Sequence, residues 1–344
     1  MRTLPSRVVL VGLLILSMAS ASPAHAGGVV GSGARSSCTE DALDAALVGG
    51  GTVTFNCGSQ PFTITVTSPK VIVVGTTLDG GGLLTLNGGR KVLIFLVSAG
   101  MTLNLSNATL TRGSFSFGGA IYNDVAATLN VANCTFSHNR APGTEADGGA
   151  IDNYGDLTVV NSTFFQNSTD GVSGAIENNG TMVVANSSFT RNSAFVGGAI
   201  ASAGPLTITN STFFRNVTYI DGSGGAIYAA GDTILQNSIV AYNRRGGNCV
   251  GTVSDGGHNL RWPPVDTSCV GTYGDPKLAH LDDNGGSIRT LRLRPGSAAI
   301  DAGDSALCAA DPINNFDQRG FVRPGGGATN CSIGAYEFNA SPAP

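Results

Sequence analysis

The chain has 344 residues, of which 12% are charged and 49 are glycine, and its formal net charge at pH 7 is −4. Ordinary soluble domains carry about 25% charged residues. The low and slightly acidic charge disfavours nucleic acid and anionic membranes as partners. Polar character comes from Asn, Ser and Thr instead, which suits contact with carbohydrate and equally suits an inert β-sheet surface.

Residues 1–26 have the three parts of a secretory signal peptide. Arg2 and Arg7 make the start basic, residues 8–18 are apolar, and a small-residue cleavage sequence ends at Ala26. The apolar run is too short to span a bilayer. We therefore expect a secreted or cell-surface protein that is cleaved after Ala26 and has no transmembrane segment in the mature chain.

Residues 27–57 precede the repeats described next, and we expect them to form an N-terminal cap. Residues 39–47 are amphipathic and predict a short helix. Solenoids need such caps because their end coils would otherwise expose the core.

Residues 58–248 contain a tandem repeat. A Gly-Ala-Ile turn recurs with its alanine at 120, 150, 175, 199 and 226. An Asn-Ser/Cys-Thr/Ser-Phe box recurs at nearly the same steps, with its asparagine at 107, 133, 161, 186, 210 and 237. Repeats of this length indicate a solenoid, a propeller or an array.

Apolar residues alternate within each repeat, as Leu157 with Val159 and Leu206 with Ile208. This period of two predicts strands. A propeller blade needs about 40 residues. Short strands joined by Gly-rich turns in about 25 residues therefore predict the coils of a parallel β-helix, stacked about 4.8 Å apart.

Stacking places equivalent residues in columns. We expect the six box asparagines, from Asn107 to Asn237, to form an internal ladder of amide hydrogen bonds. The phenylalanines of the box should form an internal aromatic column, and a second asparagine column should follow three residues later. The second column contains Asn139, Asn167, Asn192, Asn216 and Asn243.

Two parts of the chain resemble known families. The GGAI turn followed by F-x-x-N is similar to the repeat of chlamydial-type polymorphic outer-membrane proteins. Residues 249–344 resemble the C-terminal region of bacterial secreted β-helix proteins of the choice-of-anchor Q type, through GGHNL at 256–260, LRPGSAAIDAG at 293–303 and IGAYE at 333–337.

The resemblance implies an all-β fold, a right-handed parallel β-helix of the pectin-lyase-like superfold. The β-helix would have an N-terminal cap and an irregular C-terminal region that packs on the solenoid. This superfold includes enzymes and non-enzymes, so it does not decide activity.

Six of the seven cysteines fall into pairs along the chain, and an exported protein favours disulfides. The expected pairs are Cys38 with Cys57, Cys249 with Cys269, and Cys308 with Cys331. Connectivity stays open, because six cysteines allow 15 pairings. Cys134 occupies a repeat position that is serine elsewhere, and we expect it to be an inert thiol.

The residue after each Gly-Ala-Ile turn forms the row Tyr122, Asp152, Glu177, Ala201 and Tyr228. By period two this row should point outward. Asp152 and Glu177 would lie on adjacent coils beside Tyr122 as a coupled pair with one pKa raised. They could act as catalytic residues on a sugar or hold a cation. The commoner explanation is that two acids coincide at variable surface positions.

A second outward row contains His138, Gln166, Arg191, Arg215 and Tyr242. Arg191 and Arg215 would be neighbours and could bind the carboxylate of an acidic glycan. We therefore assign His138, Arg191 and Arg215 as candidate substrate-binding residues. The alternative is an ordinary solvated surface.

We expect no metal site and no cofactor. The C-terminal acids Asp301, Asp304, Asp317 and Glu337 lie near two arginines in the sequence, and they favour an ion-pair network over a calcium site. We would expect calcium as a cofactor only if the protein were a lyase.

The favoured function is therefore an exported, non-catalytic β-solenoid for cell-surface, adhesive or glycan contact. The alternative is a polysaccharide lyase or glycoside hydrolase that acts on an acidic polysaccharide. Asp152, Glu177 and Tyr122 would then be the catalytic residues. Extra residues at 140–147 lie close to Asp152 in the sequence and could form the wall of a groove.

Overall fold

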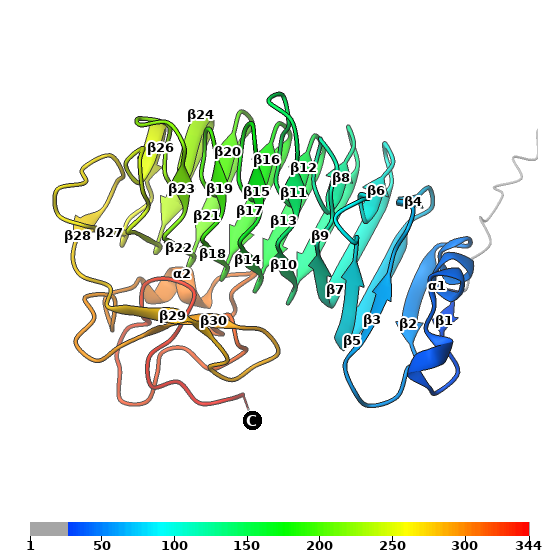
Figure 1. Cartoon of the computed structure of the whole chain (residues 1–344). Helices are drawn as coiled ribbons and strands as arrows, with labels where there is room; N and C mark the ends of the chain where they lie inside the picture. Colours follow the sequence, from blue (N-terminus) through cyan, green and yellow to red (C-terminus); the bar gives the residue numbers. More distant parts are fainter. Residues whose placement is uncertain (1–26, 344) are drawn as a thin grey trace, which may run out of the picture.

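The strand-forming repeats stack as parallel coils, and each coil forms hydrogen bonds with the coils before and after it (Figure 1). This computed structural model describes residues 27–343. The expected signal peptide lies outside the described residues.

Three rows of strands run along the solenoid. Row 1 contains β4 (Lys70–Ile72), β6 (Phe95–Val97), β8 (Ile121–Asn123), β12 (Ile151–Asn153), β16 (Ile176–Asn178) and β20 (Ile200–Ser202), and from β8 onward each strand begins at the isoleucine of a Gly-Ala-Ile turn. Row 2 contains β2 (Gly51–Phe55), β9 (Thr128–Ala132), β13 (Asp156–Val160), β17 (Thr181–Ala185) and β21 (Leu206–Thr209). Row 3 contains β3 (Phe62–Thr65), β10 (Thr135–Ser137), β14 (Thr163–Phe165), β18 (Ser188–Thr190), β22 (Thr212–Phe214), β25 (Ile239–Ala241), β27 (Leu260–Trp262) and β28 (Thr272–Tyr273).

Some long strands cross two rows. β5 (Thr76–Asn87) and β7 (Thr102–Thr111) join rows 2 and 3, while β24 (Ile227–Gln236) and β26 (Cys249–Asp255) join rows 1 and 2. A short fourth row contains β11 (Arg140–Ala141), β15 (Ser168–Thr169), β19 (Ser193–Ala194) and β23 (Val217–Thr218). Parallel pairing starts with β1 (Val29–Val30) on β2 and ends with β28, so the coils extend beyond the expected range of 58–248 at both ends.

The coil interior follows from the alternation seen in the sequence. Leu157 and Val159 of β13 are buried, whereas Thr158 between them is partly exposed. The register pairs Leu157 with Leu129 on one side and Met182 on the other, so apolar side chains stack on apolar side chains. Burial of this continuous apolar column stabilises the stack of coils, because a single coil could not bury its apolar side chains alone.

The aromatic column is confirmed. Phe136, Phe164, Phe189 and Phe213 are fully buried and stack with ring centroids 4.7 Å apart at each step. The rings are parallel to within 5°. Each ring therefore repeats the coil spacing and fixes the register of its coil.

The second asparagine column is present, and it forms an internal ladder that the sequence analysis had assigned to the box asparagines. Asn192 donates from Nδ2 to Oδ1 of Asn216 at 2.9 Å and accepts at its own Oδ1 from Asn167 at 3.1 Å. Its backbone N–H also donates to Asn216. The same bonds connect Asn139 to Asn167 and Asn216 to Asn243, so this buried column satisfies its own amides.

The expected ladder of the box asparagines is wrong except at one step, where Asn237 donates to Oδ1 of Asn210 at 2.7 Å. All six, Asn107, Asn133, Asn161, Asn186, Asn210 and Asn237, have φ between 46° and 53°. This left-handed conformation, which asparagine tolerates, turns the chain at a corner of the coil. Asn107 donates to Asp79 of the preceding coil at 2.9 Å, whereas the side chains of Asn186, Asn210 and Asn237 reach the C-terminal region. Asn186 donates to the carbonyl of Phe316, and Asn210 donates to the sulfur of Cys308.

A further internal ladder lies on row 1, and the sequence analysis did not predict it. Asn123, Asn153 and Asn178 are fully buried, and each donates to the next side chain at 2.7–2.8 Å, ending at Ser202. The sequence carries its signal, because the motif after the turn reads IYN, IDN, IEN and IAS.

The N-terminal end is closed by α1 (Glu40–Leu47), with Thr39 as its N-cap. Leu43 is fully buried in the main core. Glu40 binds the ammonium of Lys70 at 2.6 Å and so ties the helix to β4. The nearby Cys38–Cys57 disulfide is formed as expected.

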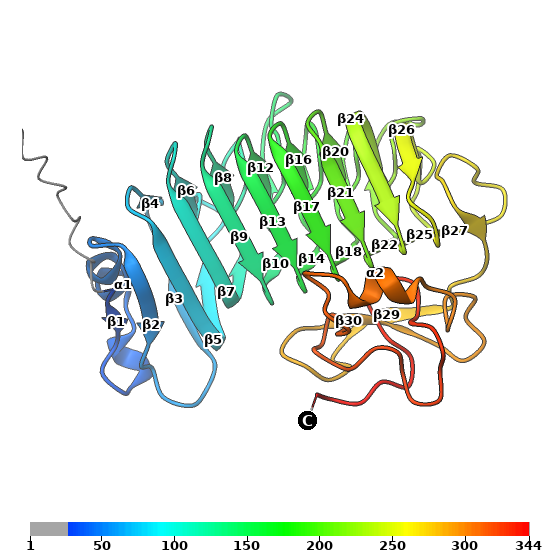
Figure 2. The same ribbon diagram turned by 180° about the vertical axis from the view of Figure 1, so that it is seen from behind.

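The C-terminal region lies against one side of the later coils (Figures 1 and 2). It contains the antiparallel pair β29 (Leu278–Asp282) and β30 (Thr290–Leu293), the short α2 (Ser305–Ala309), and a disulfide between Cys308 and Cys331. Gln318 is buried and donates to the carbonyl of Ser162 at 2.9 Å. The third expected disulfide, Cys249–Cys269, is also formed.

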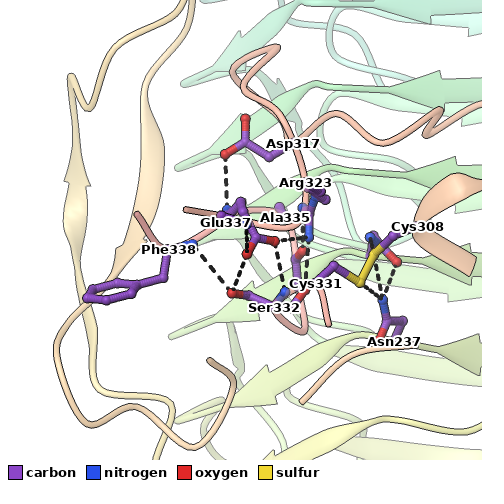
Figure 3. Close-up of polar contacts among 12 residues, drawn as sticks. Asn237, Cys308, Asp317, Arg323, Cys331, Ser332, Ala335, Glu337 and Phe338 are labelled. Atoms are coloured by element: carbon purple, nitrogen blue, oxygen red, sulfur yellow. Dashed lines mark hydrogen bonds and ion pairs between the residues drawn. A yellow bond between two sulfur atoms is a disulfide. The ribbon is translucent and has the colours of Figure 1, made fainter. Parts of the chain in front are cut away.

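Buried charges hold this region together (Figure 3). Asp317 pairs with Arg319 at 2.6 Å, and Glu337 pairs with Arg323 at 3.4 Å. Arg323 also donates to Oδ1 of Asn186 at 3.3 Å, so the network reaches the coil corners. Asp317 and Glu337 thus belong to a structural ion-pair network.

The internal ladder makes a testable prediction. Replacing Asn192 with Leu should lower the free energy of unfolding by about 3 kcal/mol, because it leaves buried amide and carbonyl groups of neighbouring coils unpaired. Chemical denaturation would measure this loss. Asn179→Leu, at an exposed position of the adjacent turn, is the matched control and should change stability little. Equal losses for both variants would contradict the ladder.

Cys134 should not react in the folded protein. It is fully buried, and burial raises the pKa of its thiol to about 12. A disulfide reagent at pH 8 should therefore label no thiol until denaturant is added, and one thiol afterwards. Rapid labelling of the native protein would show that the coil opens at this position.

Candidate functional site

The candidate binding row lies on a corner of the solenoid after the row 3 strands. His138, Gln166, Arg191, Arg215 and Tyr242 all have φ between 53° and 57°. This left-handed corner follows the buried phenylalanine by two residues, so the side chains point away from the core. The sequence therefore placed these residues correctly as one outward row.

The row is longer than the sequence analysis found. Arg112 has φ of 52° and its backbone N–H donates to the carbonyl of Ser137, just before His138. On the preceding coil Gly88 holds the equivalent position, and Arg90, two residues further on, has φ of 61° and donates its N–H to the carbonyl of Arg112. We call the complete set the arginine row. It contains Arg90, Arg112, His138, Gln166, Arg191, Arg215 and Tyr242.

A cavity of about 360 Å³ opens at the N-terminal half of this row. Its lining residues are Arg90, Ser114, His138, Arg140, Pro142, Gln166 and Ser168. We call it the arginine cleft. Guanidinium, imidazole, hydroxyl and amide groups line it, so it offers mostly hydrogen-bond donors and positive charge.

One wall of the arginine cleft is the insertion that lengthens the repeat at 140–147. Arg140 at its start binds both carboxylate oxygens of Asp170, at 2.8 and 2.6 Å. Asp170 also accepts from the backbone N–H of Gly143 at 3.2 Å. These bonds tie the insertion to the next coil, so the wall is held in place.

The other end of the arginine row is supported by aromatic contacts. The guanidinium of Arg215 lies 4.8 Å from the centroid of Phe214, whose ring also meets Tyr242 edge-on at 5.7 Å. The cation–π contact restricts the orientation of the guanidinium, so binding a ligand costs less side-chain entropy. Arg215 is therefore partly preorganised for an anionic ligand.

The candidate catalytic acids lie elsewhere, on row 1. The strand register pairs Asp152 of β12 with Glu177 of β16 and with Tyr122 of β8. The two acids are thus neighbours on adjacent coils. None of these three residues lines the arginine cleft.

The expectation that these acids face solvent is wrong. Asp152 is 0% exposed and Glu177 is 8% exposed. The Gly-Gly turn folds tightly back over the strand, since a Cβ atom on Gly148 would lie 2.9 Å from the backbone nitrogen of Asp152. The turn, with φ of 59° at Gly148, therefore lies against the backbone of the strand, and the side chain that period two directs outward is buried.

Burial controls the protonation of both acids. Burial, followed by repulsion from Asp147, raises the pKa of Asp152 to about 7. Burial and then the charges of Asp147 and Asp152 raise the pKa of Glu177 well above its usual value. Both oxygens of Asp152 and Oε2 of Glu177 have no hydrogen-bond partner. A covered, unpaired carboxyl pair cannot reach a polymeric substrate in this conformation.

Neither set of residues forms a metal centre in the part of the chain that is described. Across residues 27–343, no group of three His, Cys, Asp or Glu side chains is arranged to hold a metal ion. In the same range, no helix is both long and apolar enough to cross a membrane.

Comparisons with known proteins agree with the architecture. Residues 94–213 match the family model described as a right-handed β-helix region. Together with the parallel coils, this match identifies the fold as a right-handed parallel β-helix. No curated protein matches the chain.

One similar solved structure is the crystal structure of pectate lyase Pel9A. The alignment covers 87% of this chain and 91% of that chain, at 14% sequence identity and a TM-score of 0.36. A likeness of this degree carries no argument about activity.

The three disulfides are typical of an extracellular protein.

Proposed function

We propose that the protein is an exported, non-catalytic β-helix that binds an acidic polysaccharide along the arginine row. The observation that carries this proposal is the row itself. Four of its seven outward residues are arginine, and they lie on a chain with a net charge of −4. Positive charge is therefore concentrated where side chains are free to meet a ligand.

The spacing of the row supports a polymer as the ligand. Neighbouring coils are about 4.8 Å apart, so Arg112 and Arg191, three coils apart, are separated by about 14 Å along the axis. A chain with regularly spaced carboxylates can meet several such positions at once. Guanidinium groups bind carboxylates through paired hydrogen bonds, which favours acidic sugars over neutral ones.

The arginine cleft supports an anchoring position on the same face. It brings Arg90, His138 and Arg140 around a cavity large enough for a small ligand. Asp170 offsets the charge of Arg140, but it binds Nη2, so Nε and Nη1 can still donate to a ligand. The cleft would hold one sugar unit while the rest of the polymer follows the row.

A non-catalytic role is supported by the burial of the acid pair. A general acid or base has to come within hydrogen-bond reach of the bond that it cleaves. Asp152 and Glu177 are buried, and neither lines the cleft. Lyase or hydrolase activity is therefore an outcome for experiment, not part of the proposal.

Export and surface location are part of the proposal. The signal-like residues 1–26 and the three disulfides support export. The resemblance of the repeats to polymorphic outer-membrane proteins, and of residues 249–344 to the choice-of-anchor Q type, supports a place at the cell surface.

Binding to polygalacturonate tests the proposal. The Arg191→Ala/Arg215→Ala variant should bind about tenfold more weakly than the wild type, since each lost surface ion pair costs up to about 1 kcal/mol. Binding by the wild type should also weaken as salt is added. Isothermal titration calorimetry would measure both effects, with neutral dextran as the non-binding polymer.

Arg292→Ala/Arg294→Ala is the matched control, because it removes the same charge from exposed positions near β30. Equal weakening in both double variants would mean unspecific attraction and would contradict the row. Release of unsaturated ends or reducing ends from the polymer would contradict the non-catalytic assignment.

A further inference from the structure

We propose that Asp152 and Glu177 form a proton-holding pair that makes the central coils sensitive to pH near neutrality. The two side chains are direct neighbours in the strand register, both are buried, and three of their four oxygens have no hydrogen-bond partner. This proposal concerns stability and does not depend on the proposed function.

The surroundings of the pair offer no compensating charge. Outside the pair, the charged group that acts on it is Asp147, which precedes the Gly148-Gly149 turn, and the acids in turn raise the pKa of the nearby phenols of Tyr122 and Tyr154. The two tyrosine rings lie 5.8 Å apart. All of these groups are acids or phenols, so ionising the pair would bury unbalanced negative charge.

A proton is the occupant that fits the pair. Within residues 27–343, three acidic, thiol or imidazole groups do not converge here as metal ligands. Two close carboxyl groups in a low-dielectric site lower their energy by retaining protons, and they titrate as a coupled unit. The unpaired oxygens are then those of neutral carboxyl groups, whose burial costs far less than that of carboxylates.

The sign of the pH effect follows from the direction of the pKa shifts. Both carboxyl groups have a higher pKa in the folded protein than in the unfolded chain, where an Asp or Glu titrates near pH 4. The unfolded chain therefore loses its protons first as pH rises. Stability should fall from about pH 4 upward and continue to fall through about pH 7, where Asp152 titrates in the folded state.

The effect should reach the wall of the arginine cleft. Asp147 ends the 140–147 insertion, and its backbone is bonded on both sides, to Ser116 and to Gly118. When Asp152 and Glu177 ionise, their negative charges repel that of Asp147, which leads directly into the Gly148-Gly149 turn. Local opening of residues 142–153 is then the expected first response at alkaline pH.

Thermal unfolding between pH 5 and pH 8.5 tests the pair. The melting temperature of the wild type should fall by roughly 5–10 °C across this range. In Asp152→Asn/Glu177→Gln most of that fall should disappear, because neither side chain can ionise. The double variant Glu145→Gln/Asp221→Asn removes two exposed acids and should keep the wild-type pH dependence.

Hydrogen exchange provides a second readout. After correction for the intrinsic rate, amides of residues 142–153 should exchange faster at pH 8.5 than at pH 5.5 in the wild type, and equally fast at both values in the neutral variant. If the double variant does not fold, Glu177→Gln alone should show a reduced pH dependence of both signals.

Three results would overturn the proposal. One is a wild-type melting temperature that does not change between pH 5 and pH 8.5. Another is an unchanged pH dependence in the neutral variant. The third is recovery of the melting temperature at pH 8.5 by 1 mM CaCl₂ in the wild type but not in the neutral variant, which would identify a cation as the occupant.

Discussion

Stacking of equivalent residues on successive coils is the constraint on which the whole molecule depends. Four successive coils place a phenylalanine 4.7 Å from the next and an asparagine within hydrogen-bond distance of the next. No coil can satisfy these groups alone, so the coils are stable only as an array. The same stacking turns single surface residues into rows, and the rows carry what function the protein has.

The fold could be predicted from the sequence because the residue types in the repeat are compatible with few other structures. Period two in the strands, the buried column through Phe164 and the existence of a column through Asn192 all followed from spacing alone. It failed at Asn186, where the same residue type serves a different purpose. A left-handed corner and an internal ladder both favour asparagine, and only backbone conformation separates them.

The candidate site was predictable in part for a related reason. His138, Arg191 and Arg215 were placed as an outward row because they follow a column whose orientation is certain. Asp152 and Glu177 were expected at the surface by the same parity, yet both are buried. Parity gives the direction of a side chain but not what the neighbouring turn places over it, so their burial could not be read from spacing.

The protein therefore has two separate features that the sequence analysis had considered as candidate substrate-binding and catalytic residues: an exposed basic row for ligand contact and a buried acid pair that responds to pH. A crystal structure with a bound galacturonate oligomer tests this separation most directly. The account predicts the oligomer along the arginine row, with one unit in the cleft between Arg90 and Arg140. An oligomer on row 1, with the turn displaced and a sugar in contact with Asp152 and Glu177, would contradict it.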